Sequence, residues 1–144
     1  MLYRALATCF GIGNSKFAPG TLGTLFGAIL VSILKFEIAL KLLIGAFLLA
    51  VAIWASGAFA KEIGEKDPEN VVIDEAAGIY ACFLFIEPHF SNLVSGFLVF
   101  RAFDIIKPFP IRVFEKFPGG FGIVLDDVVA GILSGILLKL LINI

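Results

Sequence analysis

Charged residues are scarce in this chain of 144 residues: they make up 16%, against 60% hydrophobic residues. A soluble domain carries about 25% charged residues, so the low charge and a mean hydropathy of +1.04 favour lipid as the solvent. The net charge of −1 excludes the basic field with which proteins attract nucleic acids, so no nucleic-acid partner is expected. The chain is also too short for two independent cores, which predicts one domain over residues 1–144.

Cysteine and histidine, the residue types that bind soft metals, are rarer still. The two cysteines, Cys9 and Cys82, lie in different segments without the spacing of a zinc site or a disulfide framework, so both are expected to be buried apolar residues. The single histidine, His89, is expected in a solvated turn far from the other polar groups. A phosphohistidine mechanism is therefore not favoured.

Long apolar stretches take the place of charge. They cover residues 21–34, 42–60, 76–100 and 128–144. Pro88 and its polar neighbours interrupt the third stretch and divide it into two helices. The chain is therefore expected to be all-α, a compact integral membrane bundle of about five helices.

Two helix starts are predicted from polar residues beside these stretches. Asp67 and Pro68 suit an N-cap and a first-turn proline, so the third helix is expected over residues 68–86. Asp126 and Asp127 are expected to open the last helix. Only residues 42–60 approach the roughly 20 apolar residues that cross a bilayer comfortably.

The polar gaps alternate between two sides of the membrane if each helix crosses it. Residues 1–20, 61–75 and 101–127 then share one side, and residues 35–41 and 87–89 share the other. Eight of the 11 basic residues fall on the first side, which predicts that this side faces the cytoplasm. Most carboxylates gather there too, although the orientation rule makes no use of them, so their clustering needs another cause.

Five of these carboxylates are candidates for a metal and catalytic centre: Asp74, Glu75, Asp104, Asp126 and Asp127. An all-oxygen ligand set suits Mg²⁺. Simpler roles remain open for some of them, since one aspartate could cap the last helix and Arg101 could form a helix-end ion pair with Asp104.

Cations and hydroxyls on the same side suit the phosphate of a substrate. The candidate phosphate-binding residues are Lys16, Thr21, Thr24, Arg101 and Lys107. The first three belong to a glycine-rich segment that precedes a helix, where backbone N–H groups favour anions, although it is not a Walker A loop. Carboxylates for a metal beside cations for a phosphate predict metal-assisted phosphoryl chemistry at a membrane face.

Four motifs follow one another over residues 11–131. They are Lys16 with Ala-Pro-Gly-Thr-Leu-Gly-Thr24, Asp67-Pro with Ile-Asp-Glu75, Phe100-Arg-x-Phe-Asp-x-x-Lys-Pro-x-Pro-Ile111, and Gly119-Gly-x-Gly-Ile-x-Leu-Asp-Asp127. In order and spacing they resemble the phosphatidylglycerophosphatase A family. The resemblance implies a Mg²⁺-dependent enzyme of bacterial phospholipid synthesis that removes the terminal phosphate of phosphatidylglycerophosphate at the cytoplasmic face of the inner membrane.

The resemblance also implies that the five carboxylates form the metal and catalytic centre, and that Lys16, Arg101 and Lys107 contact the phosphate. The expected partners are then the lipid substrate and the surrounding membrane lipids. Attack by water and attack by an aspartate both remain open as mechanisms. The alternative function is a small membrane cation transporter or channel subunit, and a homodimer is left open.

Overall fold

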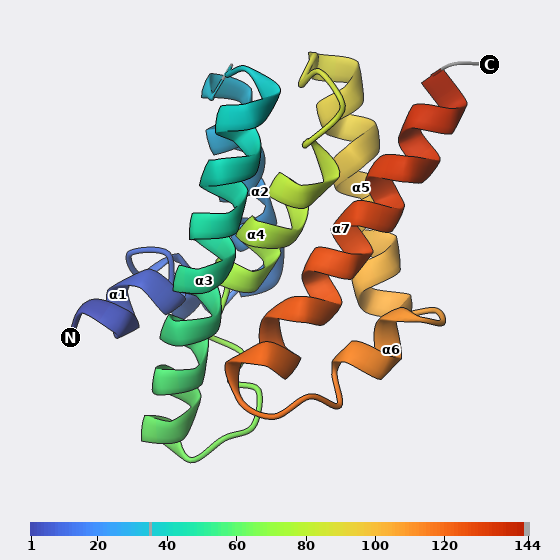
Figure 1. Cartoon of the computed structure of the whole chain (residues 1–144). Helices are drawn as coiled ribbons and strands as arrows, with labels where there is room; N and C mark the ends of the chain where they lie inside the picture. The colour runs from blue at the N-terminus through green and yellow to red at the C-terminus, as the bar shows by residue number, and fades with distance from the viewer. Residues whose placement is uncertain (35, 143–144) are drawn as a thin grey trace.

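A computed structural model describes residues 1–34 and 36–142, and all regular secondary structure within them is helical (Figure 1). The longer helices are α2 (Pro19–Ile33), α3 (Ile38–Ile63), α4 (Ile73–Cys82), α5 (Phe90–Ile106) and α7 (Gly120–Ile142). Three short helices accompany them: α1 (Leu2–Ala7), the 3₁₀ helix η1 (Ile12–Asn14) and α6 (Ile111–Phe114). The predicted all-α bundle is thus confirmed, while Lys35 of the predicted turn and residues 143–144 of the predicted last stretch lie outside the described residues.

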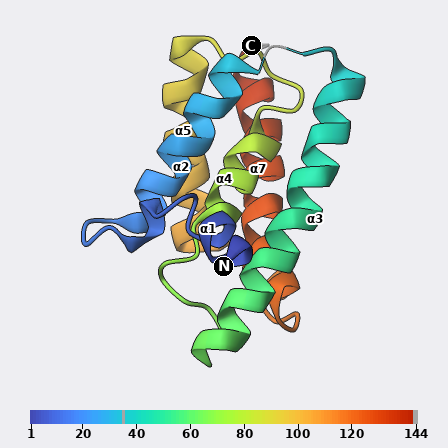
Figure 2. The same cartoon turned by 90° about the vertical axis from the view of Figure 1, so that its left-hand side faces the viewer.

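The centre of the bundle is the crossing of α4 and α7, with α2, α3 and α5 around it (Figures 1 and 2). The two helices touch through glycines: a Cβ on Gly131 would lie 1.9 Å from the Gly78 carbonyl oxygen. A Cβ on Gly120 would likewise lie 1.9 Å from the Ile53 carbonyl oxygen of α3. Small residues let helices approach closely in this way, so a side chain at Gly131 or Gly120 would push α7 away from its neighbour.

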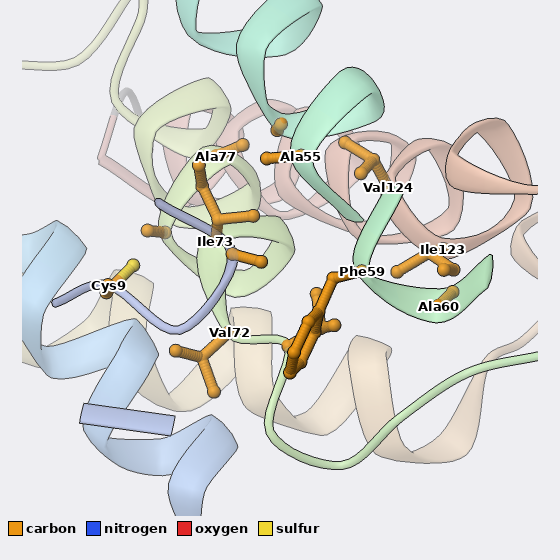
Figure 3. Packing of buried hydrophobic residues seen from close by; sticks show 13 residues of the cluster. Cys9, Ala55, Phe59, Ala60, Val72, Ile73, Ala77, Ile123 and Val124 are labelled. Carbon is orange, nitrogen blue, oxygen red and sulfur yellow. The ribbon is translucent and has the colours of Figure 1, made fainter. Parts of the chain in front are cut away.

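Small and branched side chains fill the space between α3, α4 and α7. Figure 3 shows Ala55, Ala77 and Val124 packed where the three helices meet, with Phe59 lying below them. The backbone N–H of Val72 donates to the Ala7 carbonyl oxygen at 2.9 Å, which joins the segment before α4 to α1. This packing fixes the first turn of α4 in the interior of the molecule.

Two predicted helix starts are wrong. The third helix begins at Ile73 rather than Pro68 and ends at Cys82 rather than at residue 86. Residues 68–71 instead form a turn, in which the Val71 N–H donates to the Pro68 carbonyl oxygen at 2.9 Å. The last helix begins at Gly120, so Asp126 and Asp127 lie in its second turn instead of opening it.

Most connections gather at two ends of the bundle, as predicted, but α1 lies beside the middle of α3 and not at the end where residues 1–20 were predicted (Figures 1 and 2). The loops over residues 64–72 and 107–119 share one end with α6, and residues 83–89 lie at the opposite end (Figure 1). Two helices, α3 and α7, are long and apolar enough to cross a membrane. Only 11% of the most apolar window of α3 is buried, which leaves a broad apolar surface and suggests a membrane protein.

Candidate active site

Three of the five predicted carboxylates meet where α4 crosses α7. Asp74 and Glu75 lie in the first turn of α4, and Asp127 faces them from α7. Carboxylate oxygens of these three residues, here called the acidic cluster, all lie within 4.8 Å of one another. The cluster is enclosed, since Asp74 is 7% exposed and Asp127 is 4% exposed.

Arg101 connects the acidic cluster to α5 and α2. Its Nη1 donates to Asp104 Oδ2 at 2.5 Å and lies 3.8 Å from Glu75 Oε1. The same nitrogen lies 3.4 Å from Thr24 Oγ1 on α2. The helix-end ion pair considered as a simpler role does exist, but it is not a surface pair, because the Arg101 side chain is only 17% exposed. Its second contact, with Glu75, makes it part of the site.

Lys107 forms a separate ion pair beside the acidic cluster. Its Nζ donates to Asp126 Oδ2 at 2.6 Å, and the Asp126 side chain is 4% exposed. Lys107 reaches α7 because it ends α5 in the left-handed conformation, with φ of 46°. Burial acts to lower the pKa of Lys107, but the hydrogen bond to Asp126 outweighs it and raises the pKa above the ordinary value. Lys107 is therefore a permanent positive charge here.

The start of α2 is shaped to receive the Glu75 side chain. A Cβ on Gly20 would lie 2.2 Å from Glu75 Oε1 and 3.4 Å from Arg101 Nη1. Thr24 is fully buried, and its hydroxyl donates to the Gly20 carbonyl oxygen at 2.8 Å. Sequence reasoning singled out Thr24 but missed Gly20. The signal that could have identified Gly20 is the proline-glycine pair at a helix start, where a residue without a Cβ allows close approach.

Two predicted phosphate-binding residues lie outside this group. Lys16 is exposed in the segment before α2 and forms no ion pair with the described residues. Thr21 is exposed in the first turn of α2. The structure does not bring either side chain to the acidic cluster, and their role in phosphate binding stays a prediction.

Asp67 lies beside the site instead of capping a helix. It belongs to the loop over residues 64–72 and lines a small cavity together with Lys66 and Glu115. The carboxylate of Glu115 is also 3.9 Å from Lys107 Nζ. The loop thus places an additional carboxylate at this end of the bundle, a position that the predicted helix start did not indicate.

The acidic cluster contains more negative charge than its neighbours neutralise. Asp74 Oδ1 and Glu75 Oε2 are buried and have no hydrogen-bond partner in the described part of the chain. Burial raises the pKa of Asp74 well above its ordinary range, and the charges of Glu75 and Asp127 raise it further. Such a group of carboxylates holds either protons or a cation. Because all the donor atoms are oxygens, the residues fit Mg²⁺.

The remaining predictions about reactive residues agree with the structure. His89 is exposed just before α5, at the end of the bundle opposite the acidic cluster. Cys9 and Cys82 are buried and unbridged.

Comparisons with known proteins give one consistent family. The model of the family described as phosphatidylglycerophosphatase A matches residues 5–142. The chain is 39% identical over 133 residues to "Phosphatidylglycerophosphatase A" of Haemophilus influenzae, covering 88% of this chain and 80% of that protein. It is 32% identical over 138 residues to the protein of the same name from Escherichia coli, covering 92% and 78%.

A third relative has a different name. The chain is 37% identical over 142 residues to "Putative phosphatidylinositol-3-phosphatase" of Bacteroides thetaiotaomicron, covering 92% of this chain and 89% of that protein. No solved structure matches the chain significantly.

Proposed function

The chain belongs to the phosphatidylglycerophosphatase A family and is a phosphatase, and from this premise we propose that it converts phosphatidylglycerophosphate to phosphatidylglycerol and phosphate with the help of Mg²⁺. The observation that carries this proposal is the acidic cluster beside the partly buried Arg101. Negative groups for a metal and a positive group for a phosphate meet there at the crossing of α4 and α7. A transporter or channel subunit is not supported, because the carboxylates gather with cations at one place rather than along a path.

The acidic cluster would hold the metal ion. Asp74, Glu75 and Asp127 offer oxygens close enough to share one cation, and Asp74 Oδ1 and Glu75 Oε2 have no hydrogen-bond partner among the described residues. Bound Mg²⁺ would supply positive charge that draws electron density from the phosphate oxygens. Asp104 and Asp126 are the other two carboxylates of the predicted catalytic set. Asp104 pairs with Arg101, and Asp126 pairs with Lys107.

The cations would bind and orient the phosphate. Arg101 presents a planar guanidinium that suits two phosphate oxygens at once, and Asp104 fixes its orientation from one turn away. Lys107 adds a fixed charge near Asp126. Lys16, Thr21 and Thr24 would contribute from α2 and the segment before it. Charge that develops on the phosphate oxygens during hydrolysis is stabilised by such preorganised donors.

A carboxylate of this group would also handle the proton of the reaction. If water attacks phosphorus, one aspartate accepts its proton as a general base. If an aspartate attacks instead, its bond to phosphorus replaces the bond from phosphorus to the lipid oxygen, and the lipid leaves after that oxygen takes up a proton. Water then cleaves the aspartyl-phosphate, which releases phosphate and restores the aspartate. Both routes use the same residues and give the same products.

The test measures phosphate release by the purified protein in detergent, with Mg²⁺ and with EDTA. We expect Mg²⁺-dependent release from phosphatidylglycerophosphate, and a loss of about 100-fold or more in kcat for Asp104→Asn, because Arg101 loses its orienting charge. Glu62→Gln is the matched control, since Glu62 pairs with Arg4 away from the acidic cluster. No release by folded wild-type protein would overturn the proposal.

Phosphatidylinositol 3-phosphate is the second candidate substrate, because the Bacteroides relative is named for it. Both lipids carry a phosphomonoester on the headgroup, and the site recognises that group in either. Parallel assays at equal lipid concentration decide between them. A higher kcat/KM for phosphatidylinositol 3-phosphate would identify that lipid as the preferred substrate. The reaction would still be hydrolysis of a phosphomonoester.

A further inference from the structure

An apolar groove of about 370 Å³ lies between α2 and α5. Leu25 and Ile29 line it from α2, and Val94 and Leu98 line it from α5. These four side chains are 48%, 51%, 46% and 62% exposed, respectively. The groove is therefore bounded by large apolar side chains that no other part of the described chain covers.

The groove exists because both helices turn their small residues toward α4. A Cβ on Gly27 of α2 would lie 2.8 Å from the Ala76 Cα of α4. A Cβ on Gly96 of α5 would lie 2.6 Å from the ring of Phe83, just beyond α4. Since α2 packs mainly against α4 and α5 packs mainly against α7, with only a small contact between α2 and α5, their larger side chains leave an open channel between these two helices.

One end of the groove meets the candidate active site. Leu25 directly follows Thr24, and Leu98 lies one turn before Arg101. Thr24 Oγ1 and Arg101 Nη1 are 3.4 Å apart and connect the two helices at that end. From there the groove follows α2 to Ser32, about 11 Å along the axis at 1.5 Å per residue.

The chemistry of the groove defines its occupant. Ser32 is a lining residue with a hydroxyl, and that hydroxyl already donates to the Ile29 carbonyl oxygen at 2.7 Å. The occupant must therefore be apolar along its length, while the Arg101 end favours an anionic group. We propose that the groove binds an acyl chain of the lipid substrate, an inference that rests on the proposed function. A lipid held there presents its headgroup to Arg101 and the acidic cluster.

Filling the groove tests this inference. Val94→Trp would place a large ring in the channel, and Ile136→Trp is the matched control on α7, where Ile136 is 53% exposed and does not line the groove. We expect Val94→Trp to raise KM for dioleoyl phosphatidylglycerophosphate about fivefold or more and to leave KM for the dihexanoyl lipid within about twofold. The control should change neither value. Equal changes for both lipids, or none, would overturn the inference.

A measurement independent of turnover covers the case in which Val94→Trp fails to fold. Wild-type protein is photocrosslinked to phosphatidylglycerophosphate that carries a diazirine on one acyl chain, and labelled peptides are identified by mass spectrometry. We expect labelling of residues 25–32 and 90–98 that excess unlabelled phosphatidylglycerophosphate competes away and excess phosphatidylcholine does not. Labelling spread over α3 and α7, or competed equally by both lipids, would show bulk lipid contact and overturn the inference.

The two proposals fail in different ways. Wild-type protein that releases no phosphate from either chain length overturns the proposed function. Normal release with an unchanged chain-length preference in folded Val94→Trp overturns the groove alone.

Discussion

Asp126 is nearly enclosed by protein, and its charge is balanced by one cation, Lys107, at 2.6 Å. Removing that cation with Lys107→Met leaves a buried carboxylate without its partner. Breaking a fully buried pair costs about 3–5 kcal/mol; because the Lys107 side chain is 21% exposed, we expect a loss of about 2 kcal/mol in the free energy of unfolding. Denaturant titration in detergent measures this loss.

A matched lysine separates this effect from a general loss of charge. Lys116→Met alters an exposed lysine in the nearby loop and should change stability by less than about 0.5 kcal/mol. Adding Asp126→Asn to Lys107→Met should restore part of the lost stability, because the unpaired charge is then absent. Identical stabilities for both lysine variants would contradict the importance of this ion pair.

Gly20 offers a substitution that should damage activity more than folding. In Gly20→Ala the new Cβ would lie 2.2 Å from Glu75 Oε1, which is the far end of a flexible side chain and moves at little cost. We expect phosphate release to fall about tenfold or more, because Glu75 leaves its position in the acidic cluster, with the melting temperature almost unchanged.

Gly27→Ala provides the contrast, because its Cβ would meet the backbone of Ala76 at 2.8 Å. That variant should lose stability by about 1–3 kcal/mol. If Gly20→Ala keeps full activity, Glu75 does not need the position that the structure gives it.

The sequence predicted which residue types form the site better than it predicted which of these residues form ion pairs. The excess of carboxylates over simpler needs predicted the acidic cluster, and Asp74, Glu75 and Asp127 do converge. The partner of Lys107 could not be read from spacing, because it depends on the left-handed residue that ends α5 and directs the side chain to Asp126.

At the level of elements, tertiary contacts moved two helix starts away from the positions that the local sequence predicted. Asp67 and Pro68 have the composition of a helix start, but the Val72 N–H is used by the Ala7 carbonyl oxygen and the chain forms a turn before α4. The glycines before Asp126 predicted a loop, yet α7 begins at Gly120, where the absence of a Cβ lets the helix pack closely against the Ile53 carbonyl oxygen of α3. Hydrophobic runs therefore predicted that the helices form. The residues at which the helices begin and end depend on tertiary packing, which cannot be read from the sequence.

The stability of the fold should be most sensitive to substitutions at the crossing of α4 and α7. In Gly131→Ala the added methyl would lie 1.9 Å from the Gly78 carbonyl oxygen, so the helices must separate. We expect the free energy of unfolding to fall by about 1–3 kcal/mol. Because Asp127 lies one turn before Gly131 on the same helix, phosphate release should fall as well.

The neighbouring residue Ile132 supplies the control. It is 43% exposed, and Ile132→Ala should cost less than about 1 kcal/mol because it leaves no enclosed cavity. Thermal unfolding of both variants in the same detergent measures the difference. A Gly131→Ala protein as stable as Ile132→Ala would show that α7 has room to move away from α4.

On the scale of the whole molecule, exposed apolar surface runs along the length of α3. The α3 helix, at 26 residues, extends about 39 Å and is exposed over most of its apolar length. The loops over residues 64–72 and 107–119 lie at one end of the bundle, and residues 83–89 lie at the other (Figure 1). We propose a multi-pass arrangement in the inner membrane with the acidic cluster toward the cytoplasm, consistent with the distribution of basic residues.

Cysteine labelling tests this orientation with little background. Both native cysteines are buried, and burial raises the pKa of Cys9 to about 12, so its reactive thiolate is almost absent at neutral pH. We expect a membrane-impermeant maleimide to label His89→Cys in intact cells and to label Lys116→Cys only after the membrane is opened. Unmodified wild-type protein should stay unlabelled in both conditions. Labelling of Lys116→Cys in intact cells would reverse the orientation and place the phosphatase site outside the cytoplasm.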